Sequence, residues 1–216
     1  SPVFYLKDWL GSMMYKDKHN LIPNRLKEGP LSIEIGVGHK KINPIAIGID
    51  AIDSPACDVV GDAFDVLNAL PDSCVSSVYA AHFIEHIEPV GKFLNALMRV
   101  CTEDAKIVII APHFSNPFFY SDPTHRATFG LYTFCYYSKS DLFRRTIPSY
   151  IRISGLILAS VSFHFCSYPP NYIRHALKKI IQKVVNYSNW TKELYEELFC
   201  WLAPCYEVKY ILTIKK

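Results

Sequence analysis

Short apolar runs, each ending in a glycine or a polar turn residue, recur through the first half of the sequence and constrain its fold most strongly. They lie at residues 31–35, 45–49, 58–60, 75–81 and 105–111. Between the last two runs, apolar residues from Val90 to Met98 follow the spacing of one helix face, and Pro89 stands at the expected first turn. Apolar strands that alternate with helices predict an α/β protein built on a parallel sheet.

The second half of the sequence predicts longer elements. We expect a strand at 156–165, a basic amphipathic helix at 172–185, a second helix at 190–202 and a closing strand at 206–214. Without a visible linker or repeat, residues 1–216 form one domain, with a helical lead-in over 1–30 that carries Trp9, Leu10, Met13 and Met14 on one face. The predicted fold is α/β: a Rossmann-like, doubly wound, mostly parallel seven-stranded sheet with an antiparallel C-terminal hairpin and helices on both faces.

Charge and cysteine content exclude several kinds of protein. The 23 basic and 20 acidic residues give a net charge of +3, too small to predict nucleic-acid binding. Seven cysteines without a Cys-x-x-Cys spacing predict buried free thiols in a reducing compartment, hence a cytoplasmic location. The longest apolar stretch, 153–165, is interrupted by serine, glycine and histidine, so no transmembrane segment is expected, and the first residues lack the basic start of a signal peptide.

The ends of the first three predicted strands carry residues suited to a nucleoside. Gly36 and Gly38 follow the first strand, where glycine lets the backbone approach a ligand closely. A dinucleotide site would need a third glycine at position 41, which is Lys41, so a pyrophosphate is disfavoured. Asp50 could accept both hydroxyls of a ribose, and Asp62 could meet an adenine amino group. Together these positions predict a site for an adenosine without phosphates.

The run from 31 to 112 resembles the class I S-adenosylmethionine-dependent methyltransferases. The matching pieces are IEIGVG, GID at 48–50, the segment from VVGDAF to HFIEHI, RV at 99–100 and KIVIIAP at 106–112. The resemblance implies S-adenosylmethionine as cofactor and makes 31–112 the cofactor-binding half. The cofactor-binding residues that it implies are Glu34, Gly36 and Gly38 for the methionine part, Asp50 and Ala51 for the ribose, Asp62 and Ala63 for the adenine, and His82 near the sulfonium.

Two further features place the chain near one subgroup of that family. Only fifteen residues separate Glu34 from Asp50, so the helix that usually follows the glycine loop must be short or missing. The stretch 116–126, continued at 129–134, is similar to compact O-methyltransferases of O-antigen, surface-polysaccharide or algal-virus glycans. Residues 113–155 would then be a lid on the acceptor side, with Phe118, Phe119 and Tyr120 as a platform for a sugar. The implied partner is a sugar or glycan, and the resemblance allows the chain to be part of a larger glycosyltransferase chain or complex.

A sugar hydroxyl is a weak nucleophile, so a general base is expected. His125 with Asp122 on the lid is the preferred candidate, and His86 beside Glu85 is the second. A divalent metal could instead be held by His82, Glu85, His86 and a fourth ligand, either His125 or His113, but we do not favour a metal.

The alternatives that remain are a methyltransferase acting on a small metabolite or phenol, and an inactive scaffold module of a glycosylation enzyme. The basic residues of 172–185 are interpreted as a solvated face rather than as a contact with an anionic membrane or lipid-linked glycan.

Overall fold

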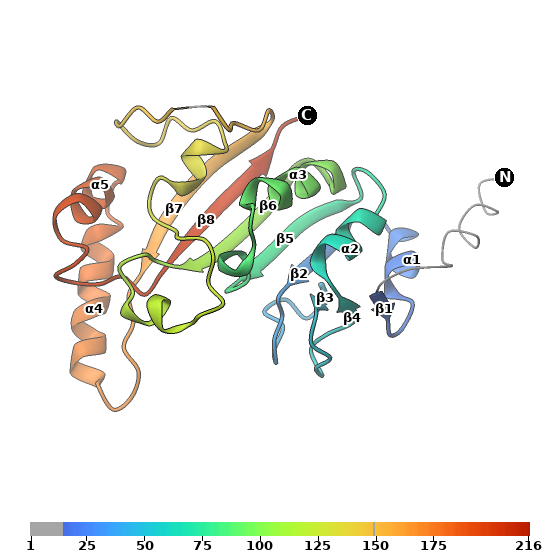
Figure 1. Ribbon diagram of the computed structural model, residues 1–216, viewed down its shortest axis with the longest axis horizontal. Helices are drawn as coiled ribbons and strands as arrows, with labels where there is room; N and C mark the ends of the chain where they lie inside the picture. The colour runs from blue at the N-terminus through green and yellow to red at the C-terminus, as the bar shows by residue number, and fades with distance from the viewer. Residues whose placement is uncertain (1–14, 149) are drawn as a thin grey trace.

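A single twisted sheet forms the centre of the computed structural model, which describes residues 15–148 and 150–216 (Figure 1). In these residues, eight strands pair in the order β1-β4-β3-β2-β5-β6-β8-β7. Their bounds are β1 Tyr15–Asp17, β2 Leu31–Ile35, β3 Ile47–Asp50, β4 Val59–Gly61, β5 Val75–Ala81, β6 Cys101–Pro112, β7 Leu156–His164 and β8 Glu207–Ile214. The four parallel pairings that join the five strands from β4 to β6 agree with the predicted parallel sheet. Strands β1 and β8, on the two sides of this group, run in the opposite direction.

The expected seven strands become eight because β1 pairs antiparallel with β4 at the edge of the sheet. This strand lies in the segment predicted as a helical lead-in, so that prediction is wrong for residues 15–17. The carboxylate of Asp17 accepts hydrogen bonds from the backbone N–H groups of Leu21 and Ile22, at 2.8 and 2.9 Å, and so turns the strand directly into α1, Leu21–Leu26. Residues 1–14, with the remainder of the predicted lead-in, lie outside the described residues.

The C-terminal strands are antiparallel, as expected, but they do not form a simple hairpin. Two helices, α4 (Tyr172–Val185) and α5 (Asn189–Leu198), connect β7 to β8. The returning strand β8 inserts between β6 and β7 and pairs antiparallel with both. Because β8 runs against its neighbours, its first residue lies at the edge where β5 and β6 end.

Two crossover helices lie on one face of the sheet. α2 (Ala63–Ala69) and α3 (Val90–Val100) lie side by side on that face, where Figure 1 shows both in front of the strands. The connections from β2 to β3 and from β3 to β4 contain turns and bends but no helix. The expectation that the helix after the glycine loop is short or missing is therefore confirmed, and the expectation of helices on both faces is not met by these crossovers.

The hydrophobic core fills the space between the sheet and these helices. Alternate residues of β8, among them Tyr210 and Leu212, are fully buried, whereas their neighbours are half-buried. Phe93 and Leu97 of α3 pack into the same core. Phe129, Leu131 and Phe134 also belong to it, so the middle of the predicted lid is part of the core rather than a surface loop. The core fixes the carboxyl ends of β2, β3, β5 and β6, around which the candidate site lies.

Candidate functional site

The loop after β2 has the backbone conformation that the two glycines allow. Gly36 and Gly38 both have positive φ, at +72° and +55°. A Cβ added to Gly36 would lie 2.9 Å from the Cβ of Phe83, so the loop also needs glycine there for space. The Gly36 N–H donates to the carbonyl of Ile49 and the Gly38 N–H to Oδ2 of Asp50, each at 2.9 Å. These contacts place the ends of β2 and β3 against each other.

Glu34 and Lys41 hold the segment that replaces the missing helix. Glu34 is buried, and its carboxylate accepts the N–H groups of Ile42 and Asn43 at 2.9 to 3.1 Å. Lys41 Nζ lies 2.6 Å from Oδ2 of Asp58 in a half-buried ion pair. The Glu34 carboxylate thus holds the loop through its backbone. Lys41 connects the same loop to the residue before β4. A dinucleotide site would have glycine at the position of Lys41.

Asp50 and Asp62 lie at the ends of adjacent parallel strands. Asp50 ends β3, and its Oδ1 accepts the Ile52 N–H at 2.9 Å, beside exposed Ala51. Asp62 follows β4 and caps α2 by accepting the Phe64 N–H at 2.8 Å, while Ala63 begins the helix and is buried. Each carboxylate retains lone pairs beyond these backbone contacts, so both can accept further hydrogen bonds. The predicted order of strand-end residues is thus present in three dimensions.

His82, just past β5, is held by a carboxylate that the sequence did not single out. Its Nε2 donates to Oε2 of Glu207 at 2.9 Å, and its Nδ1 lies 3.5 Å from Oε1 of Glu85. These hydrogen bonds, with Glu207 first, raise the pKa of His82 to about 9. Burial alone would raise the pKa of Glu207, but hydrogen bonds from His164 and His82 lower it to about 2. His82 is therefore a cation at neutral pH, and its φ of +52° adds local backbone strain.

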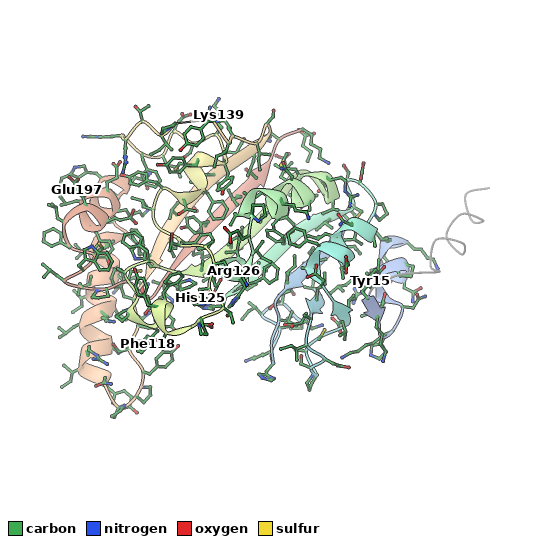
Figure 2. All side chains as sticks on the ribbon, viewed as in Figure 1. Tyr15, Phe118, His125, Arg126, Lys139 and Glu197 are labelled. Atoms are coloured by element: carbon green, nitrogen blue, oxygen red, sulfur yellow. The ribbon has the colours of Figure 1, made fainter. Side chains whose placement is uncertain are left out.

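The predicted catalytic residues come together at the end of β5. The 3₁₀ turn Ile84–His86 carries Glu85 and His86, and the backbone carbonyl of Glu85 accepts the Arg126 N–H at 2.7 Å, tying the lid to this turn. The rings of His86 and His125 lie 5.0 Å apart. His125 Nε2 is 3.6 Å from Oδ2 of Asp122 and 4.0 Å from Oε1 of Glu85. Figure 2 shows His125 and Arg126 in front of the central strands.

The hydrogen-bond network assigns the tautomers of both histidines. His125 Nδ1 donates to the carbonyl of Phe119 at 2.8 Å, and its ring stacks on that of Phe119. The Thr124 hydroxyl donates to Oδ1 of Asp122 at 2.5 Å, so it accepts the Nδ1 proton of His86 at 3.0 Å. Hydrogen bonding to Thr124 lowers the pKa of Asp122. Both Nε2 atoms are left with a lone pair that can accept a proton or bind a cation.

Glu85, His86 and His125 could hold a metal ion among the described residues. One possible ligand atom from each lies within 4.8 Å of the others, and Oε2 of buried Glu85 has no hydrogen-bond partner among the described residues. Backbone support of a ligand histidine, as Phe119 gives His125, is typical of metal sites. His82 lies outside this group, as does His113, which is fully buried and bonded to Ser115 and Glu196. The carboxylate of Glu85 and the Nε2 atoms of His86 and His125 could equally accept a hydrogen bond from a substrate hydroxyl.

The aromatic residues of the lid divide into two roles. Phe119 is buried against His125, whereas Phe118 and Tyr120 are exposed on the lid turn Pro117–Ser121, where Figure 2 labels Phe118. The Tyr120 hydroxyl donates to the carbonyl of Phe114 at 2.9 Å. Phe118 and Tyr120 are thus available for contact with an acceptor.

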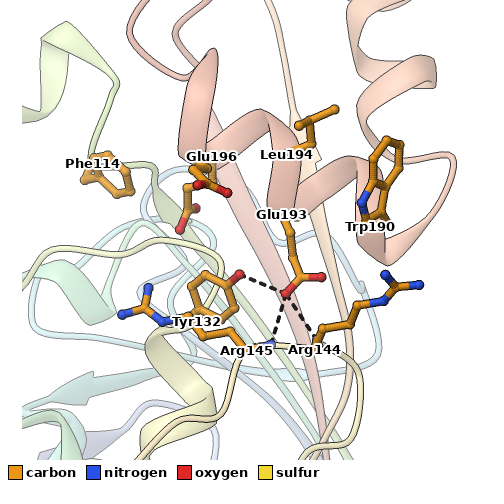
Figure 3. Close-up of a pocket in the computed structure, with 9 residues that line it drawn as sticks. Phe114, Tyr132, Arg144, Arg145, Trp190, Glu193, Leu194 and Glu196 are labelled. Atoms are coloured by element: carbon orange, nitrogen blue, oxygen red, sulfur yellow. Dashed lines mark hydrogen bonds between the residues drawn. The ribbon is translucent and has the colours of Figure 1, made fainter.

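A hollow of about 680 Å³ lies between α5 and residues 114–145 of the predicted lid segment (Figure 3). Tyr132, Phe114 and Trp190 supply aromatic surface, and Arg144, Arg145, Glu193, Glu196 and Glu197 supply charged groups. Oε1 of Glu193 accepts the Tyr132 hydroxyl at 3.0 Å and the Arg144 N–H at 3.2 Å. Among the described residues no ion pair joins the two arginines to the three glutamates.

Glu207, Thr124 and the residues of this hollow were missed in the sequence. The signal for Glu207 was nevertheless present: an acidic residue at the start of an antiparallel last strand must lie beside the ends of the parallel strands. Thr124 could have been considered because it stands between Asp122 and His125. Nothing local marked Glu193 or Glu196, which read as ordinary exposed positions of a helix.

Comparisons with known proteins give a fold but no sequence family. No family model and no curated protein matches the sequence. A solved SAM-dependent methyltransferase from Archaeoglobus fulgidus superimposes over 90% of this chain and 93% of its own, with 19% identity and a TM-score of 0.52. A SAM-dependent methyltransferase from Mesorhizobium loti matches 88% of this chain and 96% of its own, with 13% identity and a TM-score of 0.47.

Phosphoethanolamine N-methyltransferase 2 from Haemonchus contortus also matches 90% of this chain, which spans 51% of that protein, at 13% identity and a TM-score of 0.47. The fold assignment rests on the Archaeoglobus fulgidus structure, because the other two scores are lower, and on the strand order. Without the extra edge strand β1, that order has β5 in the middle and the reversed β8 between β6 and β7. The chain therefore has the fold of the class I S-adenosylmethionine-dependent methyltransferases.

Proposed function

We propose that this protein is an S-adenosylmethionine-dependent O-methyltransferase that methylates a sugar hydroxyl in a glycan. The observation that carries the proposal is the row formed by the Gly36–Gly38 loop, Asp50 and Asp62 at the carboxyl ends of three adjacent parallel strands. In open α/β sheets, ligands bind at this edge. Two glycines, a ribose-binding carboxylate and an adenine-binding carboxylate suit an adenosine cofactor that carries no phosphate.

The cofactor is oriented by this row toward the His86 and His125 side. Asp50 would accept the ribose hydroxyls, Asp62 and Ala63 would border the adenine, and the Gly36–Gly38 backbone would border the methionine part. His82 would lie near the sulfonium end of the cofactor, between the carboxylates of Glu85 and Glu207.

Methyl transfer is an in-line displacement, in which an acceptor oxygen forms a bond to the methyl carbon while the carbon–sulfur bond breaks. The bonding electron pair stays on sulfur and gives S-adenosylhomocysteine. Nε2 of His125 accepts the hydroxyl proton, because its Nδ1 proton is held by Phe119 and its lone pair lies beside Asp122. Asp122 stabilises the resulting imidazolium. Alignment of the two reacting groups supplies most of the acceleration.

A neutral sugar is the acceptor that the exposed groups favour. Phe118 and Tyr120 present aromatic faces on the lid. The hollow beside α5 adds aromatic side chains together with guanidinium and carboxylate groups that are not paired with each other. Both signs of charge on one hollow suit a ligand that donates and accepts many hydrogen bonds but carries no net charge. A small phenol would use the aromatic faces but not the guanidinium groups of Arg144 and Arg145.

Calorimetric titration with S-adenosylhomocysteine is the direct test of the cofactor site. We expect binding by the wild-type protein and a loss of about 10- to 100-fold in affinity for Asp50→Ala, since hydrogen bonds to a charged group are worth about 1.5–3 kcal/mol. Asp72→Ala is the matched control, because Asp72 pairs with Arg99 before β5, at the opposite edge of the sheet. Equal affinities in both variants would refute the assigned site. No binding by folded wild-type protein would favour an inactive scaffold.

The same titration with and without Mn²⁺ or Mg²⁺ tests the group formed by Glu85, His86 and His125. Metal binding that is lost in Glu85→Gln would give His125 the role of a ligand instead of a base. Cofactor affinity that does not depend on metal, without metal binding, would support the proposed base.

A further inference from the structure

Helix α4 packs against the protein largely through polar side chains, whereas an ordinary surface helix does so through an apolar face. Of its apolar residues, Val185 is buried and Ile181 packs partly against the core. Lys178 Nζ donates to the carbonyl of Cys166 at 3.0 Å, and Lys179 Nζ lies 2.7 Å from Nε2 of His164. Oε1 of Gln182 accepts the Phe165 N–H at 2.9 Å. Two of the four basic residues that the sequence assigned to a solvated face thus point at the protein, and that interpretation is wrong for them.

The opposite side of α4 is an exposed apolar stripe. It consists of Ile173, Leu177, Ile180 and Val184, whose exposed fractions are 81%, 57%, 60% and 62%. Spacings of four, three and four residues place these side chains in one line along the helix, about 16 Å long. Isolated exposed apolar residues are normal, but a continuous line of branched side chains indicates a surface that binds another apolar surface.

Cations flank this stripe on both sides. Arg174 follows Ile173 and Lys183 precedes Val184, so each lies about 100° around the helix from the stripe, in opposite directions. Both are exposed, and α4 contains no acidic residue. Exposed tyrosines stand at both ends of the helix: Tyr172 at 71% and Tyr187 at 86%. Tyrosine is enriched at the boundary between lipid and water.

The charges decide among the possible occupants. Two copies packed stripe to stripe would bring Arg174 and Lys183 of one close to the same cations of the other, which is unfavourable. An anionic bilayer can instead bury the apolar stripe among its acyl chains, while its negative headgroups attract the cations on both sides of the stripe. Figure 1 shows α4 at the end of the molecule opposite β1, where a flat surface can reach it. In the described part of the chain, no helix has the length and hydropathy to cross a bilayer, so contact through α4 would be along the surface.

We propose that α4 binds the surface of an anionic phospholipid bilayer. Its apolar stripe enters the boundary of the acyl chains, and Arg174 and Lys183 contact the headgroups. This proposal stands independently of the proposed methyl transfer. It would bring the protein next to a lipid surface whatever its acceptor is.

Vesicle flotation of the 216-residue chain tests the proposal. We expect binding to phosphatidylcholine vesicles that contain phosphatidylserine, and weak binding to phosphatidylcholine alone. The double change Arg174→Gln and Lys183→Gln should weaken partitioning about 25-fold, since each cation near an anionic surface contributes about 1 kcal/mol. Lys139→Gln with Arg152→Gln is the matched control, because it removes two exposed cations away from α4. Its binding should equal that of the wild type.

Leu177→Asp with Ile180→Asp should abolish vesicle binding, whereas Ile151→Asp, at another exposed apolar position, should not. Thermal unfolding and S-adenosylhomocysteine titration of each variant check its fold and separate this test from that of the cofactor site. Equal binding to neutral and anionic vesicles, or binding by the doubly acidic variant, would overturn the proposal. So would a wild-type dimer in light scattering that becomes a monomer in that variant, because the stripe would then join two copies.

Discussion

At the scale of single residues, the two glycines after β2 carry different constraints although both have positive φ. A Cβ at Gly36 would meet Phe83 at 2.9 Å, whereas a Cβ at Gly38 would have no atom within 4 Å. We expect Gly38→Ala to cost about 1 kcal/mol of stability from backbone strain alone. Gly36→Ala should cost about 2–4 kcal/mol because overpacking adds to the strain. Chemical denaturation measures both, and equal losses would contradict the role given to Phe83.

The ion pair between His82 and Glu207 predicts a pH-dependent stability. The pKa of His82 is raised from 6.5 to about 9. Its contribution to the free energy of unfolding is therefore fully present below pH 6.5 and is lost as the pH rises through about 9. The pKa of Glu207 is lowered from 4.5 to about 2, so its contribution is present above pH 4.5 and lost as the pH falls through about 2. Both contributions are complete between pH 4.5 and 6.5.

Thermal unfolding at pH 6.5 and pH 9 measures the histidine contribution. His82 is half exposed, so solvent screens its ion pair. We therefore expect protonated His82 to contribute about 1 kcal/mol to the free energy of unfolding, which corresponds to about 2–4 °C in the unfolding midpoint temperature. The wild-type protein should lose this amount between the two pH values, and His82→Gln should not. The same loss in the variant would mean that another group titrates.

The base assigned to the reaction predicts a separation of catalysis from binding. His125→Ala should slow the transfer of radiolabelled methyl groups to glycans by about 100-fold or more, because a general base contributes about that factor. Affinity for S-adenosylhomocysteine should remain close to that of the wild type. His175→Ala on α4 is the control outside the site. Wild-type rates in His125→Ala would remove this histidine from the mechanism.

At the scale of elements, hydrogen bonds to the backbone hold two segments around the candidate site. The buried carboxylate of Glu34 binds backbone N–H groups of the loop that replaces a helix. The carbonyl of Glu85 holds the lid through Arg126. Residues 129–134 were predicted as part of the lid, but Phe129 and Phe134 pack against Tyr210 in the core. Their apolar character was visible in the sequence, while the surface against which they pack was not.

At the scale of the whole molecule, the seven cysteines are free, and all but Cys166 are buried. Burial raises the pKa of the thiols, Cys166 included, and so keeps them protonated. Mass spectrometry after brief maleimide treatment should show one adduct on the native protein, at Cys166, and seven on the denatured protein. Cys166→Ala should then give a native protein without adduct. Rapid labelling of several sites in native protein would contradict the packing of the core.

The sequence by itself determined the features that depend on local order. Apolar runs with turn residues predicted the parallel strands, and their ends carried Gly36, Gly38, Asp50 and Asp62 in the order that an α/β sheet brings to one edge. His86, Asp122 and His125 were also identified, because each lies on a segment that leaves a strand at that edge.

Only the tertiary structure decided which distant residues meet. Pairing of β8 against β6 brings Glu207 to His82, 125 residues away in the chain, and gives that histidine its charge. Edge strand β1 forms because β4 offers free hydrogen-bonding groups, which no pattern within residues 15–17 reveals. The helical period of α4 was evident, yet which of its faces meets the protein depended on the polar partners that β7 presents. Periodicity fixes the relative positions of side chains on a helix, and packing fixes the side that is buried.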